Sequence, residues 1–143
     1  MSRTSAIAVA ATAAMLAAGS VWAADRFPAM QRVSVLEAPL SGKPNVETVK
    51  GARIAYAPGQ PTGLHVHPIP VVGVVTAGSF VFEPSGQPAR TLHTGDAFFE
   101  PANTPILRFD NASTTERAEI TAFYLIDAPD RPLIKMLAPA DAK

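Results

Sequence analysis

The chain has no cysteine, and positive and negative charges are balanced. Without cysteine, neither disulfides nor thiolate chemistry can contribute to this protein. Lys and Arg number 12, as do Asp and Glu, and no run of basic residues occurs. Because binding to phosphates needs clustered positive charge, we expect no nucleic-acid partner. Beyond the first 23 residues there is also no apolar run long enough to span a membrane.

The N-terminal residues have the pattern of a secretory signal peptide. Arg3 supplies a positive charge, Ala6–Ala18 is a short apolar run, and Val21–Ala23 fits the small-x-small cleavage rule. The pattern predicts that residues 1–23 are a signal peptide and that the protein is exported to a bacterial periplasm. An uncleaved anchor is the alternative. The remaining residues, 24–143, have the length of one domain, and we expect no membrane contact after cleavage.

Short segments rich in Val, Ile, Phe and Thr follow one another through the mature chain, separated by turn residues. Many short strands with frequent turns indicate an all-β sandwich or small barrel. Helical periodicity is absent apart from one turn of helix expected near Arg131–Leu137. The predicted strands are Arg32–Glu37, Thr48–Tyr56, Gly63–His67, Val71–Thr76, Ser79–Glu83, Arg90–His93, Ala97–Glu100, Thr104–Phe109 and Ala118–Ile126.

Two of the three histidines, His65 and His67, lie one residue apart in a predicted strand. Side chains of a strand alternate between its faces, so these two imidazoles point the same way. Two imidazoles side by side can share one metal ion. Pocket-lining histidines that bind no metal are the alternative. The third histidine, His93, precedes a Thr-Gly turn and is expected to face solvent.

Two sequence motifs resemble those of the cupin superfamily. Residues Gly59–Gly78 are similar to the first cupin motif, G-x5-H-x-H-x3-E-x6-G, and Gly95–Asp110 are similar to the second, G-x5-P-x-G-x2-H-x3-N. The resemblance implies a double-stranded β-helix, a jelly-roll barrel with a pocket in its mouth. Because cupins often pair through edge strands, it also implies a homodimer.

The metal-ligand set of the family is only partly present. The usual cupin site uses three histidines and one glutamate, and His65 and His67 match two of these ligands. Val71 stands at the glutamate position and Ile106 at the third histidine position. Neither side chain can coordinate a metal, so a third ligand must come from elsewhere.

Glu100 is the candidate third ligand. In cupins the residue before the second-motif proline usually faces the barrel interior, on the face of Phe98. Two histidines and one carboxylate would suit Fe, Mn or Zn and leave open positions for substrate. The alternative is an ion pair between Glu100 and Arg108, because Arg108 is expected on the same strand face as Ile106. A free, inward-facing Arg108 could instead hold a carboxylate or enolate substrate.

These features lead to one main hypothesis and two rivals. The main hypothesis is an exported small cupin that binds one divalent metal, Fe, Mn or Zn, through His65, His67 and Glu100. It would act on a small oxygenated molecule such as a dicarbonyl, enol or phenol, with quercetinase-like dioxygenases as the leading enzyme class. The rivals are a non-catalytic cupin that binds a small metabolite and a structural homodimer subunit. No catalytic side chain is assigned.

Overall fold

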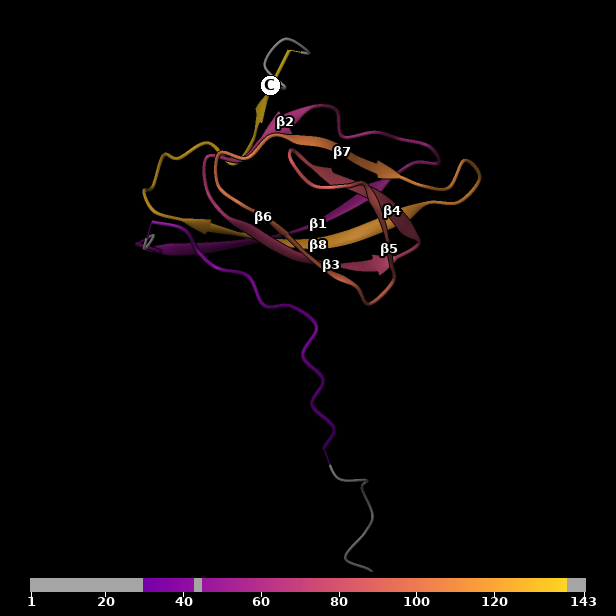
Figure 1. Cartoon of the computed structure of the whole chain (residues 1–143), viewed down its shortest axis with the longest axis horizontal. Coiled ribbons are helices and arrows are strands. Elements are labelled where there is room, and N and C mark those ends of the chain that lie inside the picture. Colours follow the sequence, from indigo (N-terminus) through magenta and orange to yellow (C-terminus); the bar gives the residue numbers. More distant parts are fainter. Residues whose placement is uncertain (1–29, 43–44, 139–143) are drawn as a thin grey trace, which may run out of the picture. The chain divides into compact units, whose positions relative to one another are not determined.

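The computed structural model describes residues 30–42 and 45–138 (Figure 1). The chain divides into two units, Met1–Arg32 and Val33–Lys143, and every strand belongs to the second. The predicted signal peptide, residues 1–23, lies outside the described residues. Among the residues described, no helix is long and apolar enough to cross a membrane.

In the described part of the chain, nine strands form two antiparallel sheets that face each other (Figure 1). The first sheet has the order β1-β8-β3-β6 and the second the order β5-β4-β7-β2-β9. This arrangement confirms the predicted all-β jelly-roll fold of the cupins. The strands are β1 (Thr48–Tyr56), β2 (His65–Val66), β3 (Val71–Ala77), β4 (Ser79–Pro84), β5 (Arg90–His93), β6 (Ala97–Glu100), β7 (Ile106–Asn111), β8 (Ala118–Ile126) and β9 (Lys135–Met136).

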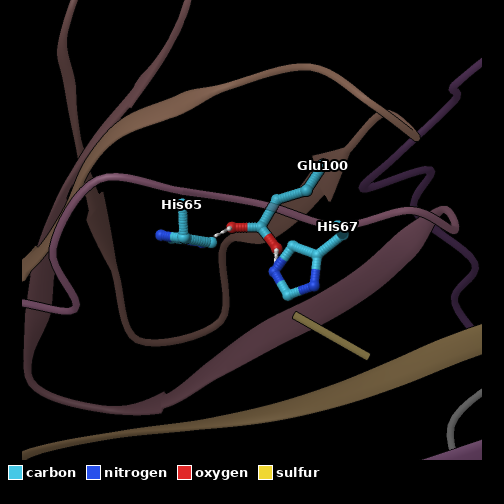
Figure 2. A group of neighbouring side chains, drawn as sticks. All are labelled: His65, His67 and Glu100. Atoms are coloured by element: carbon cyan, nitrogen blue, oxygen red, sulfur yellow. Dashed lines mark ion pairs between the residues drawn. The ribbon is translucent and has the colours of Figure 1, made fainter. Parts of the chain in front are cut away.

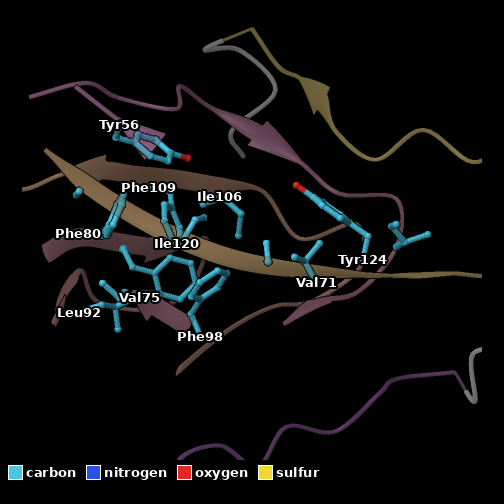
Figure 3. Close-up of a cluster of buried hydrophobic side chains, with 14 of the residues drawn as sticks. Tyr56, Val71, Val75, Phe80, Leu92, Phe98, Ile106, Phe109, Ile120 and Tyr124 are labelled. Atoms are coloured by element: carbon cyan, nitrogen blue, oxygen red, sulfur yellow. The ribbon is translucent and has the colours of Figure 1, made fainter. Parts of the chain in front are cut away.

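The core lies between the inner faces of the two sheets. Every second residue of β8, beginning with Ala118, is buried, as expected for a sheet with one covered face. Aromatic rings fill the space between the layers (Figure 3). Phe98 of the first sheet meets Phe109 of the second edge to face, with 4.9 Å between ring centroids. Aromatic packing of this geometry adds to the stabilisation that comes from burial alone.

Gly73 on β3 allows β6 to approach closely. A Cβ atom at this position would collide with the Phe98 ring and would lie 2.7 Å from the Thr121 carbonyl oxygen. The missing side chain therefore leaves room for Phe98 against β3. Because Phe98 and Glu100 share the inner face of β6, this packing also fixes the strand that carries the candidate third ligand.

Two predicted elements differ from the structure. Arg32–Glu37 forms no strand, and its Val33 and Val35 side chains are 78% and 67% exposed. Its residues favour β structure, but among the described residues no neighbouring strand pairs with it, and a strand needs such a partner. The turn of helix expected in Arg131–Leu137 is also wrong, because this segment contains β9, which pairs with β2.

Candidate metal centre

Three side chains from two separate parts of the chain meet in the interior of the barrel (Figure 2). His65 lies on β2, His67 follows just after that strand, and Glu100 ends β6. Their exposed fractions are 1%, 4% and 4%. The sequence-based expectation that both imidazoles project to one side, and that Glu100 faces inward with Phe98, agrees with this placement.

The glutamate lies between the two imidazole rings. Its Oε2 atom is 3.0 Å from Nε2 of His67, and its Oε1 atom is 3.9 Å from Nε2 of His65. Potential ligand atoms of the three residues all lie within 4.8 Å of one another. Metal–nitrogen and metal–oxygen bonds are about 2.0–2.2 Å long. Small side-chain rotations would therefore bring all three ligands onto one ion.

Backbone carbonyl groups fix the orientation of both rings. Nδ1 of His65 is 2.7 Å from the Gly63 carbonyl oxygen, and Nδ1 of His67 is hydrogen-bonded to the Leu133 carbonyl oxygen. A carbonyl can only accept, so each Nδ1–H donates and each neutral ring keeps its lone pair on Nε2. Those lone pairs face a carboxylate, and such an arrangement is favourable only with a proton or a metal ion between the groups. A ring that donates one nitrogen's hydrogen to a carbonyl and leaves the other nitrogen free is typical of metal-binding histidines.

The two charged groups shift each other's proton affinity. Burial disfavours the charged form of His67, but the hydrogen bond to Glu100 and its negative charge outweigh burial and raise the pKa of His67. Burial likewise raises the pKa of Glu100, but the nearby His65 and His67 rings outweigh it and lower that pKa overall. The pair of shifts therefore favours protonation of His67 beside an ionised Glu100 in the metal-free protein.

This coupling predicts a stability maximum for the metal-free protein at mildly acidic pH. His67, with a raised pKa, contributes stability below its ordinary value of 6.5, and this contribution is lost as pH rises through the folded-state pKa. Glu100, with a lowered pKa, contributes stability above its ordinary value of 4.5, lost as pH falls through the folded-state pKa. Urea unfolding of chelator-treated protein from pH 3 to pH 10 measures the free energy of unfolding on both sides of this maximum. A free energy of unfolding that does not change above pH 7 would contradict a proton shared between His67 and Glu100. A His93→Ala control should lose stability on both sides of the maximum as the wild type does.

A cavity of ≈ 50 Å³ lies beside the three residues. Its wall is mostly apolar, and Phe98, Phe109 and Ile120 are among the residues that form it. Three hydroxyl groups also line it, those of Tyr56, Thr62 and Tyr124. Burial, with a smaller effect of the Glu100 charge, raises the pKa of Tyr124, so its hydroxyl keeps its proton at neutral pH.

Arg108 does not reach this cavity. Its side chain is 49% exposed, and its Nε atom is 3.1 Å from Oδ2 of Asp110. The sequence predicted that Arg108 and Ile106 share one strand face, and the pairing of β4 with β7 explains why they do not. Glu83 pairs with Arg108 but Pro84 pairs with Ile106, so Leu107 is an extra residue that forms a bulge. The bulge turns Arg108 outward, so the expected inward orientation and the Glu100–Arg108 ion pair are wrong, and the substrate role of Arg108 loses its geometric basis.

The two apolar residues at the family's ligand positions are neighbours of the actual triad. Val71 pairs with Glu100 across β3 and β6, and Ile106 pairs with His65 across β2 and β7. Directly opposed residues share one face of a sheet. The carboxylate of Glu100 therefore enters the cavity from the strand beside the usual glutamate position, which is occupied by Val71.

Sequence reasoning missed two groups at this site. Tyr124 was not singled out from the sequence, although the alternation of β8 places it on the inner face. The Leu133 carbonyl group comes from a position 66 residues beyond His67. No sequence pattern marks a carbonyl group as the partner of a distant ring.

Sequence comparison identifies the family. Residues 52–124 match the model of the cupin domain. This match covers about half of the chain, and the chain belongs to the cupin family. Among curated proteins, none matches the chain.

Solved structures with the same fold include an oxidase, a lyase and a cupin-like protein. An oxalate oxidase shares 24% identity at a TM-score of 0.54, over 62% of this chain and 46% of the other. A DMSP lyase from Ruegeria pomeroyi shares 19% identity at a TM-score of 0.56, over 65% and 45% of the two chains. A cupin-like protein from Thermotoga maritima shares 24% identity at 0.51, over 62% and 64%. The matched region spans just under half of the oxalate oxidase and the lyase, and these likenesses show the fold alone.

Proposed function

We propose that this protein is a small metal-binding cupin in which His65, His67 and Glu100 hold one divalent Fe, Mn or Zn ion. The observation that carries the proposal is the convergence of two Nε2 atoms on one buried carboxylate, with both Nδ1 atoms committed to carbonyl groups. Three protein ligands of this kind leave coordination positions open for a small molecule. Imidazole and carboxylate ligands suit Fe, Mn and Zn ions.

The function that we propose is binding and polarisation of a small oxygenated organic molecule, with dioxygenase-like turnover as the enzymatic form. A bound divalent metal supplies Lewis acidity. The protein's own residues hold the ligands in place: Gly63 and Leu133 orient the rings, and the apolar wall around Phe98 limits access of water. A non-catalytic binding module is the second candidate, favoured by Val71 and Ile106 at the family's other ligand positions.

Metal analysis of untagged protein tests the proposal. Protein purified without an affinity tag or added metal should contain about one equivalent of Fe, Mn or Zn per chain, which three converging ligands predict. Oxygen-uptake assays of the metal-loaded protein with small dicarbonyls, enols and hydroxy acids then separate turnover from binding. Protein that is metal-free, and that takes up none of these metals when they are supplied, would overturn the metal-binding function.

Export is a second proposal, supported by the composition of residues 1–23. The full-length chain expressed in a bacterial host should be recovered from the periplasm with its mature sequence beginning at Ala24. Intact-mass measurement of the periplasmic fraction checks both points. A variant with Ala23→Arg should remain uncleaved, because the cleavage rule requires a small residue there. Recovery of the wild-type chain uncleaved in the cytoplasm would contradict the proposal.

Homodimerisation stays a prediction. The segment Arg32–Glu37 has strand-forming residues but pairs with no other described residue, and Val33 and Val35 are largely exposed. These features would suit pairing with an edge strand of a second copy.

A further inference from the structure

One cavity hydroxyl has no hydrogen-bond partner among the residues that the structure describes. Tyr124 is 9% exposed, its ring centroid lies 5.9 Å from that of His67, and it lines the cavity. It pairs with Val71, which in turn pairs with Glu100, so the three residues form one row across the inner face of the sheet. No fully buried side-chain polar atom among the described residues lacks a partner, so the unpaired Tyr124 hydroxyl oxygen must be accessible from the cavity or from solvent. Tyr124 is therefore a donor beside the candidate metal ligands that nothing in the described protein uses.

The second tyrosine of the cavity differs in this respect. The Thr62 hydroxyl donates to the Phe109 carbonyl oxygen at 2.7 Å, which uses its only proton. The Tyr56 hydroxyl, 2.8 Å from Thr62 Oγ1, must therefore donate to it. Figure 3 shows the two tyrosine hydroxyls directed toward the space between their rings. Of the three hydroxyl groups that line the described cavity, the one on Tyr124 alone has a hydrogen available to donate to a ligand.

The size of the cavity limits what can bind there. Its volume is ≈ 50 Å³. About 10–15 Å³ of such volume is needed for each water-sized group, so the cavity accepts about three to five non-hydrogen atoms. A polyphenol cannot be enclosed within it. The cavity therefore favours smaller substrates than those of the quercetinase-like dioxygenases that the family resemblance suggested.

The charge of the cavity limits the ligand further. A divalent ion and the Glu100 carboxylate together carry one net positive charge, with both histidines neutral. No Lys or Arg is found among the lining residues. A monoanion therefore makes the site neutral, whereas a dianion would leave an uncompensated negative charge against an apolar wall, which is costly.

We propose that the site takes compact monoanionic oxygen ligands and that Tyr124 donates a hydrogen bond to the bound ligand. This inference rests on the proposed metal site and adds the class of ligand and a residue that positions it. The ligand class comprises deprotonated hydroxy-carbonyl compounds, small monocarboxylates and small hydroxamates. Larger molecules cannot be enclosed in the cavity, and dianions are disfavoured by charge.

The test measures binding of defined probes to the Zn-loaded protein by calorimetry. Acetohydroxamate, a monoanionic oxygen donor of five non-hydrogen atoms, should bind at least about tenfold more tightly than the bulkier benzohydroxamate. Acetate should bind more tightly than oxalate, which is a dianion. A Tyr124→Phe substitution should weaken acetohydroxamate binding about tenfold to a hundredfold, the loss expected for a hydrogen bond to a charged group. Zn affinity itself should be unchanged, because Tyr124 is not one of the three ligands.

A Tyr56→Phe variant is the matched control, because it removes the same atom from the same cavity. Its hydroxyl is already bound to Thr62, so acetohydroxamate affinity should change less than about twofold. Equal losses in both tyrosine variants would overturn the role of Tyr124, as would no loss in Tyr124→Phe. Preferential binding of oxalate or benzohydroxamate would overturn the ligand class. Failure of the wild-type protein to bind Zn would instead overturn the proposed function, so the two failures are distinguishable.

Discussion

Replacing both imidazole ligands, His65→Ala with His67→Ala, should reduce the metal content from about one equivalent per chain to less than about one tenth. Glu100 would be the only ligand left, and biological sites of this type need three or more protein ligands. The loss should persist when the purified variant is dialysed against excess Fe, Mn or Zn. Elemental analysis of wild-type and variant protein, prepared side by side without a tag, measures the effect.

A His93→Ala variant is the matched control, because it removes the one other histidine of the chain. His93 lies at the end of β5 and is exposed, so this variant should retain full metal content. A double variant that still binds one equivalent would show that the metal is held elsewhere.

The double variant also leaves Glu100 buried without a partner. Breaking one side of a buried ion pair costs about 3–5 kcal/mol, enough to unfold a small domain. A triple variant, His65→Ala, His67→Ala and Glu100→Gln, removes the stranded charge and should fold, as shown by its circular dichroism spectrum. It should bind no metal, which keeps the ligand assignment testable even if the double variant is unfolded.

Neutralising the carboxylate alone, with Glu100→Gln, should lower metal affinity by at least about 100-fold. Loss of a partner outside the coordination sphere already costs about 10–100-fold in metal affinity, and a direct ligand contributes more. The same substitution should change the metal-free protein, because glutamine cannot stabilise a proton on His67. The pKa of His67 should fall, and the loss of stability on the alkaline side of pH 6.5 should disappear. Competition with a chromophoric chelator and urea unfolding measure the two effects.

Glu119→Gln provides the control for this substitution. Glu119 forms an ion pair with Arg53 at 3.5 Å on the surface, where such pairs contribute little. Its replacement should leave both metal affinity and the pH profile unchanged. Wild-type metal affinity in Glu100→Gln would remove Glu100 from the ligand set and leave the two histidines without a carboxylate.

The regular part of the fold was predictable because it follows local patterns. The bounds of β1, β5, β6 and β8 agree with the sequence-based strands, since these segments combine β-forming residues with clear turn residues at their ends. The cupin resemblance implied that Glu100 faces the interior with Phe98, and the burial pattern of β6 agrees.

The same rule failed where the strand is irregular. Arg108 was expected beside Ile106 on the inner face, and a single extra residue, Leu107, reverses that expectation. A bulge depends on how two strands pair, so it cannot be seen in one strand's sequence. For the same reason Arg32–Glu37, with suitable residues but no pairing strand among those described, is not part of either sheet.

The link between His67 and Leu133 has a consequence for the far end of the chain. Lys135 and Met136 are exposed, yet they lie beside the strand of His65 and just beyond the carbonyl that holds the His67 ring. Removal of residues 133–138 would leave the three proposed ligands in place and should still weaken metal binding, because the His67 ring would lose the carbonyl group that orients it. We therefore expect residues 133–138 to contribute preorganisation to the proposed metal site although they supply none of its ligands.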